Sequence, residues 1–306
     1  MKNALRWCAG FAALGLSSSV YSAALHADID WYAGADLAIV HHEGVRSSET
    51  DWMSHKSWVG VDGSAKFTEK HRLLFVVEQE FSVQDSRLHS DSFGAGDHYL
   101  GVENSHGVLR LGSFDTALKV TVDEVDLFSD GPGDLEPLLS ANAHGGNVIA
   151  YHTPEDQPWR VDVALLAGEG ADAHAYAAGV SWRDGPVRAD ISAELGVADG
   201  GADIVRGMLQ WRGADWSLSW LREVEDSSAR RYATAGSFEM IFGRVGLRLQ
   251  HIDSDIQTPG SHRSSVGIDY YQRKNLTIYS YAVRDVVARG AVSEHYFLIG
   301  LRYVIQ

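Results

Sequence analysis

The stretch SEHYFLIGLRYVIQ, residues 293–306, separates its side chains onto two faces when the backbone is extended. Successive side chains of a strand point to opposite sides, so residues of one parity share a face. A strand of this kind separates an apolar surrounding from a polar one. The apolar face holds Phe297, Ile299, Leu301, Tyr303 and Ile305, and the mixed face holds Glu294, Tyr296, Gly300 and Arg302.

The opposite end of the sequence has the pattern of a secretory signal peptide. Lys2 and Arg6 precede an apolar run from Trp7 to Leu16, and small residues follow this run. The run is shorter than the roughly 18 residues that a membrane-spanning helix needs. We expect residues 1–24 to be the signal peptide, with cleavage after Ala24. The single cysteine, Cys8, lies inside it, so the mature chain would contain no disulfide.

The expected mature chain, residues 25–306, is strongly acidic and has no sign of a domain boundary. Without Lys2 and Arg6, 24 basic residues stand against 41 acidic ones, which gives a formal charge of −17. An acidic surface argues against nucleic acid as a partner. No Pro/Ser-rich linker or low-complexity stretch interrupts the chain, so we expect a single domain.

Alternating hydrophobicity and turn residues predict an all-β protein of sixteen strands, with no long helix outside the signal peptide. The clearest example is PVRADISAELGV, in which residues 187, 189, 191, 193, 195 and 197 are all apolar. The expected strands are residues 27–41, 55–67, 71–83, 97–104, 107–114, 147–153, 159–168, 173–183, 186–197, 202–212, 215–224, 231–241, 243–252, 263–273, 275–285 and 293–305.

The connections between these strands alternate in length. Short ones such as TEK, SH, GP and KN alternate with longer ones, including HEGVRSSETDWMS at residues 42–54 and a 32-residue segment at 115–146. Outer-membrane barrels have short turns at one end and long loops at the other. The sequence therefore predicts an antiparallel transmembrane β-barrel. A β-propeller would need a repeat of roughly 40 residues, and none is visible.

In a closed barrel the last strand pairs with the first, ADIDWYAGADLAIV at residues 27–40. The lipid-facing side of a barrel strand is apolar and the lumen-facing side can be charged. We therefore expect two faces in the first strand as well. Ile29, Trp31, Ala33, Ala35, Leu37 and Ile39 would face lipid or a neighbouring subunit, and Asp30, Tyr32, Gly34 and Asp36 the lumen.

Several blocks of the sequence resemble the Gram-negative general porins. They are SWVGVDGSAKF, HRLLFVVEQEFSV, DHYLGVENSHGVLRLGSFDTALK, NVIAYHTPEDQPWRVDVAL and FLIGLRYVIQ, in that order along nearly the whole mature chain. The resemblance implies a homotrimeric channel whose third external loop, here residues 115–146, folds into the lumen and narrows it. The sequence departs from the family pattern in two ways: Ser113 replaces a common arginine, and the chain ends in Ile305 and Gln306 where a terminal phenylalanine is usual.

The expected constriction loop is acidic, with Lys119 as its single lysine. We expect its carboxylates to form the narrow part of the pore, where low-dielectric walls strengthen their field. A solvated acidic loop and a calcium site in DGPGDLE are alternatives. Strand parity places Lys56, Arg72 and Arg110 on the facing wall, where pairing with Glu78 or Glu80 is an equally good role. The loop carboxylates are Asp115, Asp123, Glu124, Asp126, Asp130, Asp134 and Glu136.

These observations favour an outer-membrane porin for passive diffusion of small hydrophilic solutes and ions, with a preference for cations. We expect no catalytic residue, metal or cofactor. A barrel hydrolase is the weaker alternative, because no G-x-S-x-G elbow and no helical pair of histidines is present. A substrate-selective anion channel is the other alternative. It would rest on a possible ladder of lumen-facing arginines at Arg188, Arg206, Arg244, Arg248 and Arg302.

Overall fold

The computed structural model describes residues 27–44, 47–83, 96–140, 144–167, 174–198, 202–227, 229–288 and 293–305. The expected signal peptide, residues 1–24, and the terminal Gln306 lie outside these ranges. Within the described ranges, no helix has the length and apolar composition that crossing a membrane requires.

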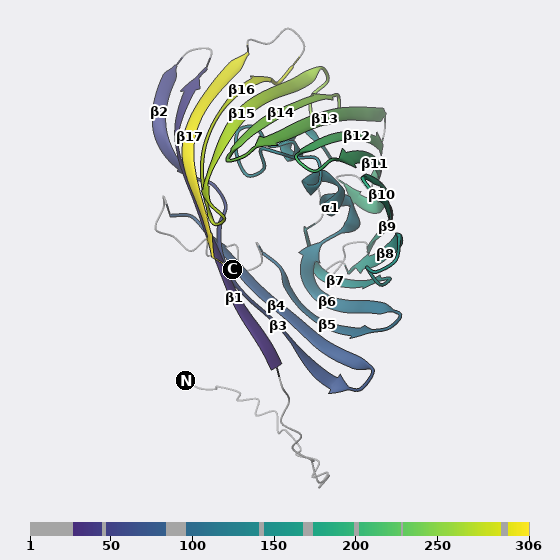
Figure 1. The fold of residues 1–306 in the computed structure, drawn as a ribbon. Coiled ribbons are helices and arrows are strands. Elements are labelled where there is room, and N and C mark those ends of the chain that lie inside the picture. The colour runs from purple at the N-terminus through teal and green to yellow at the C-terminus, as the bar shows by residue number, and fades with distance from the viewer. Residues whose placement is uncertain are drawn as a thin grey trace, which may run out of the picture.

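The described chain is almost entirely antiparallel β-structure, wound into a ring around a lumen (Figure 1). The segments are β1 (Ala27–Glu43), β2 (Ser48–Ser54), β3 (Ser57–Thr68), β4 (His71–Phe81), β5 (His98–Asn104), β6 (Gly107–Asp115), β7 (His144–His152), β8 (Trp159–Leu166), β9 (Ala175–Asp184), β10 (Val187–Ala198), β11 (Ala202–Arg212), β12 (Trp216–Asp226), β13 (Arg230–Phe242), β14 (Val245–Ser254), β15 (Ser261–Arg273), β16 (Leu276–Val286) and β17 (Glu294–Ile305).

The β2 and β3 segments together act as one barrel strand, so the described part of the chain forms sixteen strands. The lower half of β1 pairs with β3, from Ala27↔Ala65 to Gly34↔Trp58, and its upper half pairs with β2, from Leu37↔Ser54 to Glu43↔Ser48. On its other side, β1 pairs with β17 from Ala33↔Ile305 to Glu43↔His295. This last pairing closes the sheet, which confirms the predicted sixteen-stranded antiparallel barrel.

The sequence-based boundary of the second strand is wrong. Residues 48–54 were expected in a long loop, but they form β2. This segment reads SETDWMS and is mostly exposed. It therefore lacks the apolar alternation that identifies a strand with one face against lipid. Its strand conformation is instead fixed by hydrogen bonding to β1.

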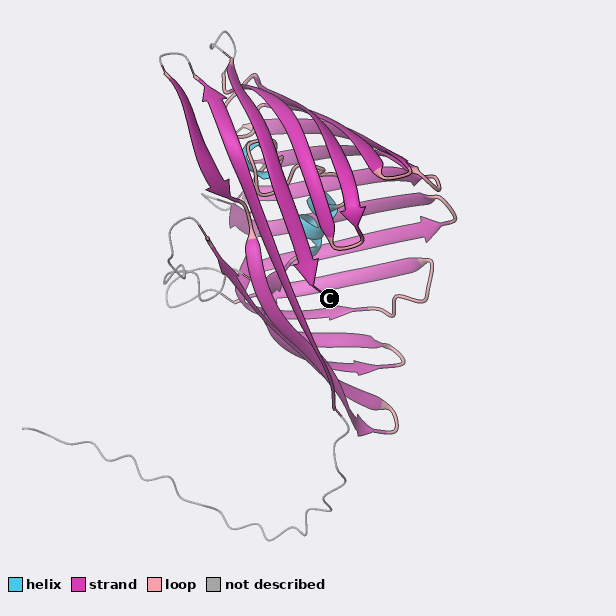
Figure 2. Ribbon diagram, turned by 60° about the vertical axis from the view of Figure 1, so that its left-hand side comes forward, coloured by secondary structure: helices cyan, strands magenta, loops and turns pink. Residues whose placement is uncertain are grey.

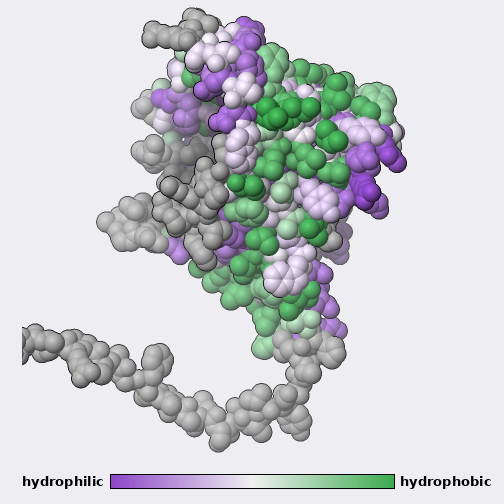
Figure 3. Space-filling view, turned by 90° about the vertical axis from the view of Figure 1, so that its left-hand side faces the viewer, coloured by the Kyte–Doolittle hydropathy of each residue, from purple (hydrophilic) through white to green (hydrophobic). Residues whose placement is uncertain are grey.

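The two faces of the wall follow the predicted parity. In β17, Ile299 is 57% exposed on the outside, whereas Leu298, on the inner side, is 3% exposed. In β1, Trp31 is 70% exposed on the outside and Asp36 is 1% exposed on the inside. Figure 3 shows hydrophobic side chains over the middle of the outer wall, with hydrophilic ones gathered toward its edges.

The connections also segregate as predicted. Two-residue turns join β3 to β4, β5 to β6, β9 to β10, β13 to β14 and β15 to β16, and Figure 2 shows such turns at one end of the barrel. Gly185 and Gly243 begin two of these turns with φ of 54° and 63°, a left-handed conformation that glycine adopts without a Cβ clash. The longer connections lie at the opposite end, which is the external end in outer-membrane barrels.

Candidate functional site in the lumen

The segment between β6 and β7 lies inside the barrel, as the resemblance implies. It contains α1 (Ala117–Asp123) and a short 3-10 helix, η1 (Glu136–Leu138). The α1 helix contacts β9, β10 and β11, and Figure 1 shows it within the ring of strands. We call the described part of this segment, residues 116–140, the lumen segment.

Apolar side chains dock the lumen segment on one side of the inner wall. Val122 and Leu135 are fully buried, and they belong to a cluster with Leu221 and Ile252 of the wall. Burying each such side chain stabilises the docked segment by about 1.5–3 kcal/mol. The cluster consists of Val122, Val125, Leu135, Leu138, Leu139, Met208, Leu221, Ala233, Ala235, Ile252 and Ile256.

Polar wall side chains satisfy the backbone of the lumen segment. The Arg206 guanidinium donates to the Leu118 carbonyl oxygen over 2.6 Å, and the Glu223 carboxylate accepts from the Ser140 amide over 2.7 Å. Arg206 and Glu223 are fully buried and form an ion pair with each other, with Nε to Oε2 at 2.6 Å. Gln250 accepts from the Leu127 amide and donates to the Gly133 carbonyl oxygen. The segment is therefore fixed to β11–β14 rather than free in the lumen.

Two of the seven predicted pore carboxylates have a structural role. Asp126 is 9% exposed, and its carboxylate accepts hydrogen bonds from the amides of Phe128 and Leu135 at 2.8 and 2.9 Å. Asp134 accepts from the amides of Asp130 and Glu136 at 3.0 and 2.7 Å. Among the described residues, no group of three or more His, Cys, Asp or Glu side chains is arranged to hold a metal ion. The DGPGDLE stretch, residues 130–136, is thus a turn whose backbone amides are bound by the carboxylates of Asp134 and Asp126.

The other five carboxylates lie nearer the open lumen. Glu124 pairs with Arg188, and Glu136 pairs with Lys119. Asp123 is exposed, and its Oδ1 lies 2.8 Å from Lys119 Nζ. Asp130 is also exposed and adopts a left-handed conformation, with φ of 63°. Asp115, at the end of β6, lines a hollow between α1 and the wall strands β8–β10.

The three predicted basic wall residues do not act together. Lys56 lies at the break between β2 and β3, and its Nζ is 2.7 Å from Glu80 Oε1. Arg110 packs over the rings of Tyr99 and Phe114. Arg72 lies beside the β3–β4 turn, where it donates to Glu103 and Ser64. These contacts place Arg72 at the short-turn end of the barrel, apart from Lys56 and Arg110.

The predicted arginines do not form an open ladder. Arg206 lies beneath the lumen segment, and Arg248 donates to the Leu127 carbonyl oxygen and pairs with Asp269. Arg302 pairs with Asp36, with Nε to Oδ2 at 2.7 Å. Arg188 pairs with Asp190 as well as Glu124. Arg244 stands exposed in the β13–β14 turn.

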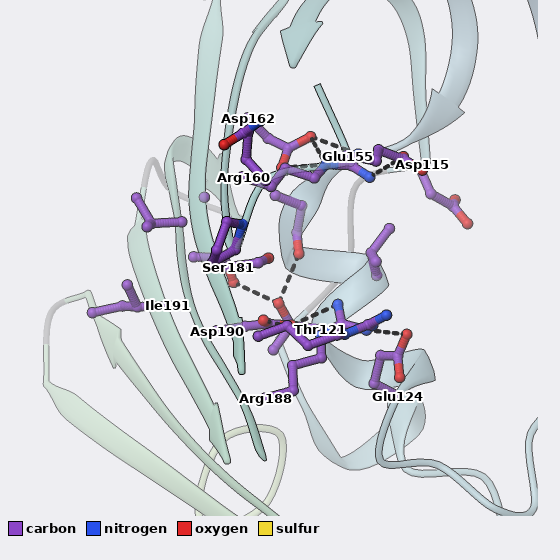
Figure 4. Close-up of a pocket in the computed structure, with 18 of the residues that line it drawn as sticks. Asp115, Thr121, Glu124, Glu155, Arg160, Asp162, Ser181, Arg188, Asp190 and Ile191 are labelled. Atoms are coloured by element: carbon purple, nitrogen blue, oxygen red, sulfur yellow. Dashed lines mark hydrogen bonds and ion pairs between the residues drawn. The ribbon is translucent and has the colours of Figure 1, made fainter. Parts of the chain in front are cut away.

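Two hollows of about 320 Å³ each adjoin the lumen segment. The first lies between α1 and β8–β10, where Arg160 pairs with Asp162 and Glu155, and Arg188 pairs with Asp190 and Glu124 (Figure 4). The second lies on the β1–β4 side and is lined by Asp36, Lys56, Trp58, Glu78, Ser129, Asp130 and Arg302. Both hollows combine charges of opposite sign, as expected for water-filled space.

Comparison with known proteins identifies the family. The model of the Gram-negative porins matches residues 10–287. The chain belongs to the Gram-negative porin family. It is 21% identical over 262 residues to the major outer membrane protein P.IB of Neisseria lactamica, which covers 81% of this chain and 72% of that protein.

Solved porin structures share the fold of this porin. An anion-selective porin from Comamonas acidovorans matches with a TM-score of 0.72 at 15% identity, over 91% of this chain and 100% of that one. OmpT of Vibrio cholerae in its trimer form matches with a TM-score of 0.66 at 16% identity, over 91% and 99%. This porin is a multi-pass β-barrel of the outer membrane that forms a channel, and it is not an enzyme.

Sequence reasoning missed the residues that anchor the lumen segment of this porin. The signal was present, because Met208, Leu221, Ala233, Ala235 and Ile252 are apolar residues at lumen-facing positions. A water-filled lumen does not require apolar side chains, so a cluster of them on adjacent strands marks a covered part of the wall. The Asp36–Arg302 pair was also missed as a pair, although both residues were placed on the lumen side.

Proposed function

We propose that this porin is a passive diffusion channel for small hydrophilic solutes, with a modest preference for cations. The observation that carries the proposal is the exposure of Asp123 and Asp130 on the lumen segment. Lys119 is shared between Asp123 and Glu136, so these three groups keep one net negative charge. Lys56 lies 2.7 Å from Glu80, which neutralises it. Low-dielectric walls strengthen the remaining negative field on ions that pass.

The charges that line the two hollows support the sign of this preference and reduce its size. In the second hollow, Asp36, Glu78 and Asp130 face Lys56 and Arg302. In the first, five carboxylates face four arginines, and both hollows are therefore negative by one charge. This excess is smaller than the seven carboxylates of the loop sequence imply, because Asp126 and Asp134 bind backbone amides. The five carboxylates are Asp115, Glu124, Glu155, Asp162 and Asp190, and the arginines are Arg110, Arg160, Arg183 and Arg188.

The reversal potential in a salt gradient tests this proposal. The refolded channel should prefer cations near 0.1 M salt, where the screening length is about 10 Å, and lose most of the preference near 1 M, where it is about 3 Å. Replacing both carboxylates, Asp123→Asn with Asp130→Asn, should move the low-salt reversal potential toward zero. Glu69→Gln removes the same kind of charge from the exposed β3–β4 turn and should leave it unchanged.

An anion-selective potential in the unmodified channel would reject the cation preference and favour the anion-channel alternative. The anion-selective porin from Comamonas acidovorans, which shares this fold, makes this outcome a specific competitor. We further propose a homotrimer that starts near Leu25, supported by the trimer form of the Vibrio cholerae structure. Native mass spectrometry of the same preparation should give three copies of residues 25–306, and a monomer mass would reject this assembly.

A further inference from the structure

The second hollow contains an aromatic ring that the passage of ions does not require. Trp58 of β3 is the register partner of Gly34 in β1, and a Cβ at Gly34 would overlap the six-membered ring of the indole. The missing side chain at Gly34 therefore lets the indole lie flat against the inner wall. Trp58 is half-buried and lines the hollow, so the ring face that does not cover Gly34 is turned toward the lumen. Such a face in a water-filled space can bind a ligand that has an apolar face of its own.

Hydrogen-bonding groups around this ring have no partner in the described part of the chain. Ser129 and Asp130 are exposed, and neither the Ser129 hydroxyl nor the Asp130 carboxylate makes a hydrogen bond to another described residue. The Arg302 guanidinium uses Nε to bind Asp36, whereas its Nη1 and Nη2 bind no described residue. All of these residues line the same hollow as Trp58. The hollow therefore offers donors and acceptors beside an aromatic face.

The protein holds these groups in place before any ligand arrives. His55 Nδ1 lies 2.7 Å from the Asp130 carbonyl oxygen, which fixes the backbone at that point of the lumen segment. Asp36 holds Arg302 through Oδ2, and its Oδ1 accepts from the Tyr279 hydroxyl at 2.5 Å. Groups that are already ordered lose little entropy when a ligand binds.

The charges in the hollow disfavour a charged ligand over the ring. Lys56 and Arg302 would repel an organic cation there, and Glu78 and Asp130 would repel an anion. A neutral molecule with several hydroxyl groups uses both kinds of partner, because each hydroxyl can donate to a carboxylate and accept from a guanidinium. The ligand that fits is therefore neutral, rich in hydroxyl groups and flat on one side.

We propose that the second hollow binds a pyranose sugar, with the C–H face of the sugar ring on Trp58 and its hydroxyl groups on Asp130 and Arg302. The volume of about 320 Å³ lies in the range of ligand pockets, about 300–1,000 Å³. Ser129 and Arg302 also line an adjoining cavity of about 240 Å³ that contains the half-buried Tyr271, so a second sugar unit has room to follow. The proposal rests on the diffusion channel proposed above, because the sugar enters through the lumen.

Block of the ion current by cellobiose, a disaccharide of glucose, tests the proposal in planar bilayers. At about 1 M salt the screening length is about 3 Å, so the cation preference contributes little. Cellobiose should reduce the current in a saturable way, whereas polyethylene glycol of the same hydrodynamic radius has no ring face and should not saturate. Trp58→Leu should raise the half-blocking concentration about tenfold, which corresponds to about 1.4 kcal/mol. Trp58→Phe keeps a ring and should raise it less.

A second variant leaves the wall unchanged. Ser129→Leu fills the hollow from the exposed side of the lumen segment and should also raise the half-blocking concentration about tenfold. Trp220→Leu on the outer face of β12 and Ser105→Leu in the β5–β6 turn are matched controls, and cellobiose should block both like the unmodified porin. These substitutions change no charge, so the low-salt reversal potential should stay the same in every variant.

The outcomes separate this proposal from the cation preference. Equal half-blocking concentrations in Trp58→Leu, Ser129→Leu and the unmodified porin, or a block that does not saturate, would overturn the sugar site. A block by choline or phenylalanine that depends on Trp58, with none by cellobiose, would overturn the choice of ligand. A saturable cellobiose block in a channel with an anion-selective reversal potential would support the sugar site and reject only the cation preference.

Discussion

At the scale of the residue, position decides what each carboxylate does. Asp123 and Asp126 lie three positions apart, yet Asp123 is exposed whereas Asp126 is buried and closes a turn through the Phe128 and Leu135 amides. Burial, together with the neighbouring Asp134 charge, raises the pKa of Asp126 to about 7, against the opposing effect of the two amide hydrogen bonds. The Asp126 carboxyl is therefore partly protonated near neutral pH.

This raised pKa predicts a pH dependence of stability. A folded-state pKa above the unfolded value contributes stability that is fully present below about pH 4 and is lost as the pH rises through about 7. One proton gives a slope of at most about 1.4 kcal/mol per pH unit. The free energy of unfolding of the refolded barrel, measured by urea denaturation from about pH 5 to about pH 8, should show this loss. Asp126→Asn should flatten it and Asp123→Asn should not, so an unchanged slope in Asp126→Asn would contradict the assignment.

At the scale of the element, the lumen segment is bound to one side of the inner wall and narrows the lumen from that side. The apolar cluster on β11–β14 supplies the contact area, and wall side chains accept or donate the hydrogen bonds that its irregular backbone cannot make internally. The Arg206–Glu223 pair is central because Arg206 also holds the Leu118 carbonyl oxygen. Because the segment lies against β11–β14, the lumen stays open on the other side, where Lys56 and Glu78 line the second hollow.

Removing Arg206 should be costly because it leaves Glu223 charged and buried. Breaking one side of such a pair costs about 3–5 kcal/mol. Arg206→Met should lower the free energy of unfolding by about that amount and increase conductance fluctuations in single-channel records, as α1 loses an anchor. Arg230→Met breaks the exposed pair with Asp226 and should leave the free energy of unfolding nearly unchanged. Equal losses in the two variants would show that the Arg206 pair does not anchor the segment.

At the scale of the whole molecule, the closed sheet places lipid and water on opposite sides of a single layer. The β1–β17 pairing from Ala33 to Glu43 closes the described sheet, so the backbone groups along this seam are hydrogen-bonded inside the wall. Neighbouring residues of one strand therefore experience different surroundings. Val180 and Ser181 of β9 are such neighbours, because Val180 is 36% exposed on the outside and Ser181 lines the first hollow.

Val180 and Ser181 should therefore differ in how well they tolerate substitution by a charged residue. Val180→Arg places a cation against the lipid and should cost about 2–4 kcal/mol near the bilayer midplane, whereas Ser181→Arg extends into water. The yield of the heat-resistant folded form in lipid vesicles should fall for Val180→Arg and stay near normal for Ser181→Arg. Similar yields for both variants would contradict the assigned faces.

Much of the fold was predictable because a barrel strand is encoded locally. Apolar and polar residues alternate in residues 187–197 and 297–305 because one face of each strand contacts lipid and the other faces the lumen. The pattern failed at residues 48–54, where β2 has no apolar face for the pattern to record. It also failed to show that β2 and β3 form one interrupted strand, since that follows from their shared pairing with β1.

The sequence by itself determined the strand order, the inner and outer faces, the alternation of short and long connections and the acidic character of the lumen segment. Only the tertiary structure decided which charges remain available to a solute. Asp126 and Asp134 bind backbone amides, Arg206 and Arg248 lie against the lumen segment, and Arg72 lies near the short turns. The physical reason is range: alternation acts between neighbours in the chain, whereas an ion pair such as Arg302–Asp36 joins residues that meet only when the barrel closes.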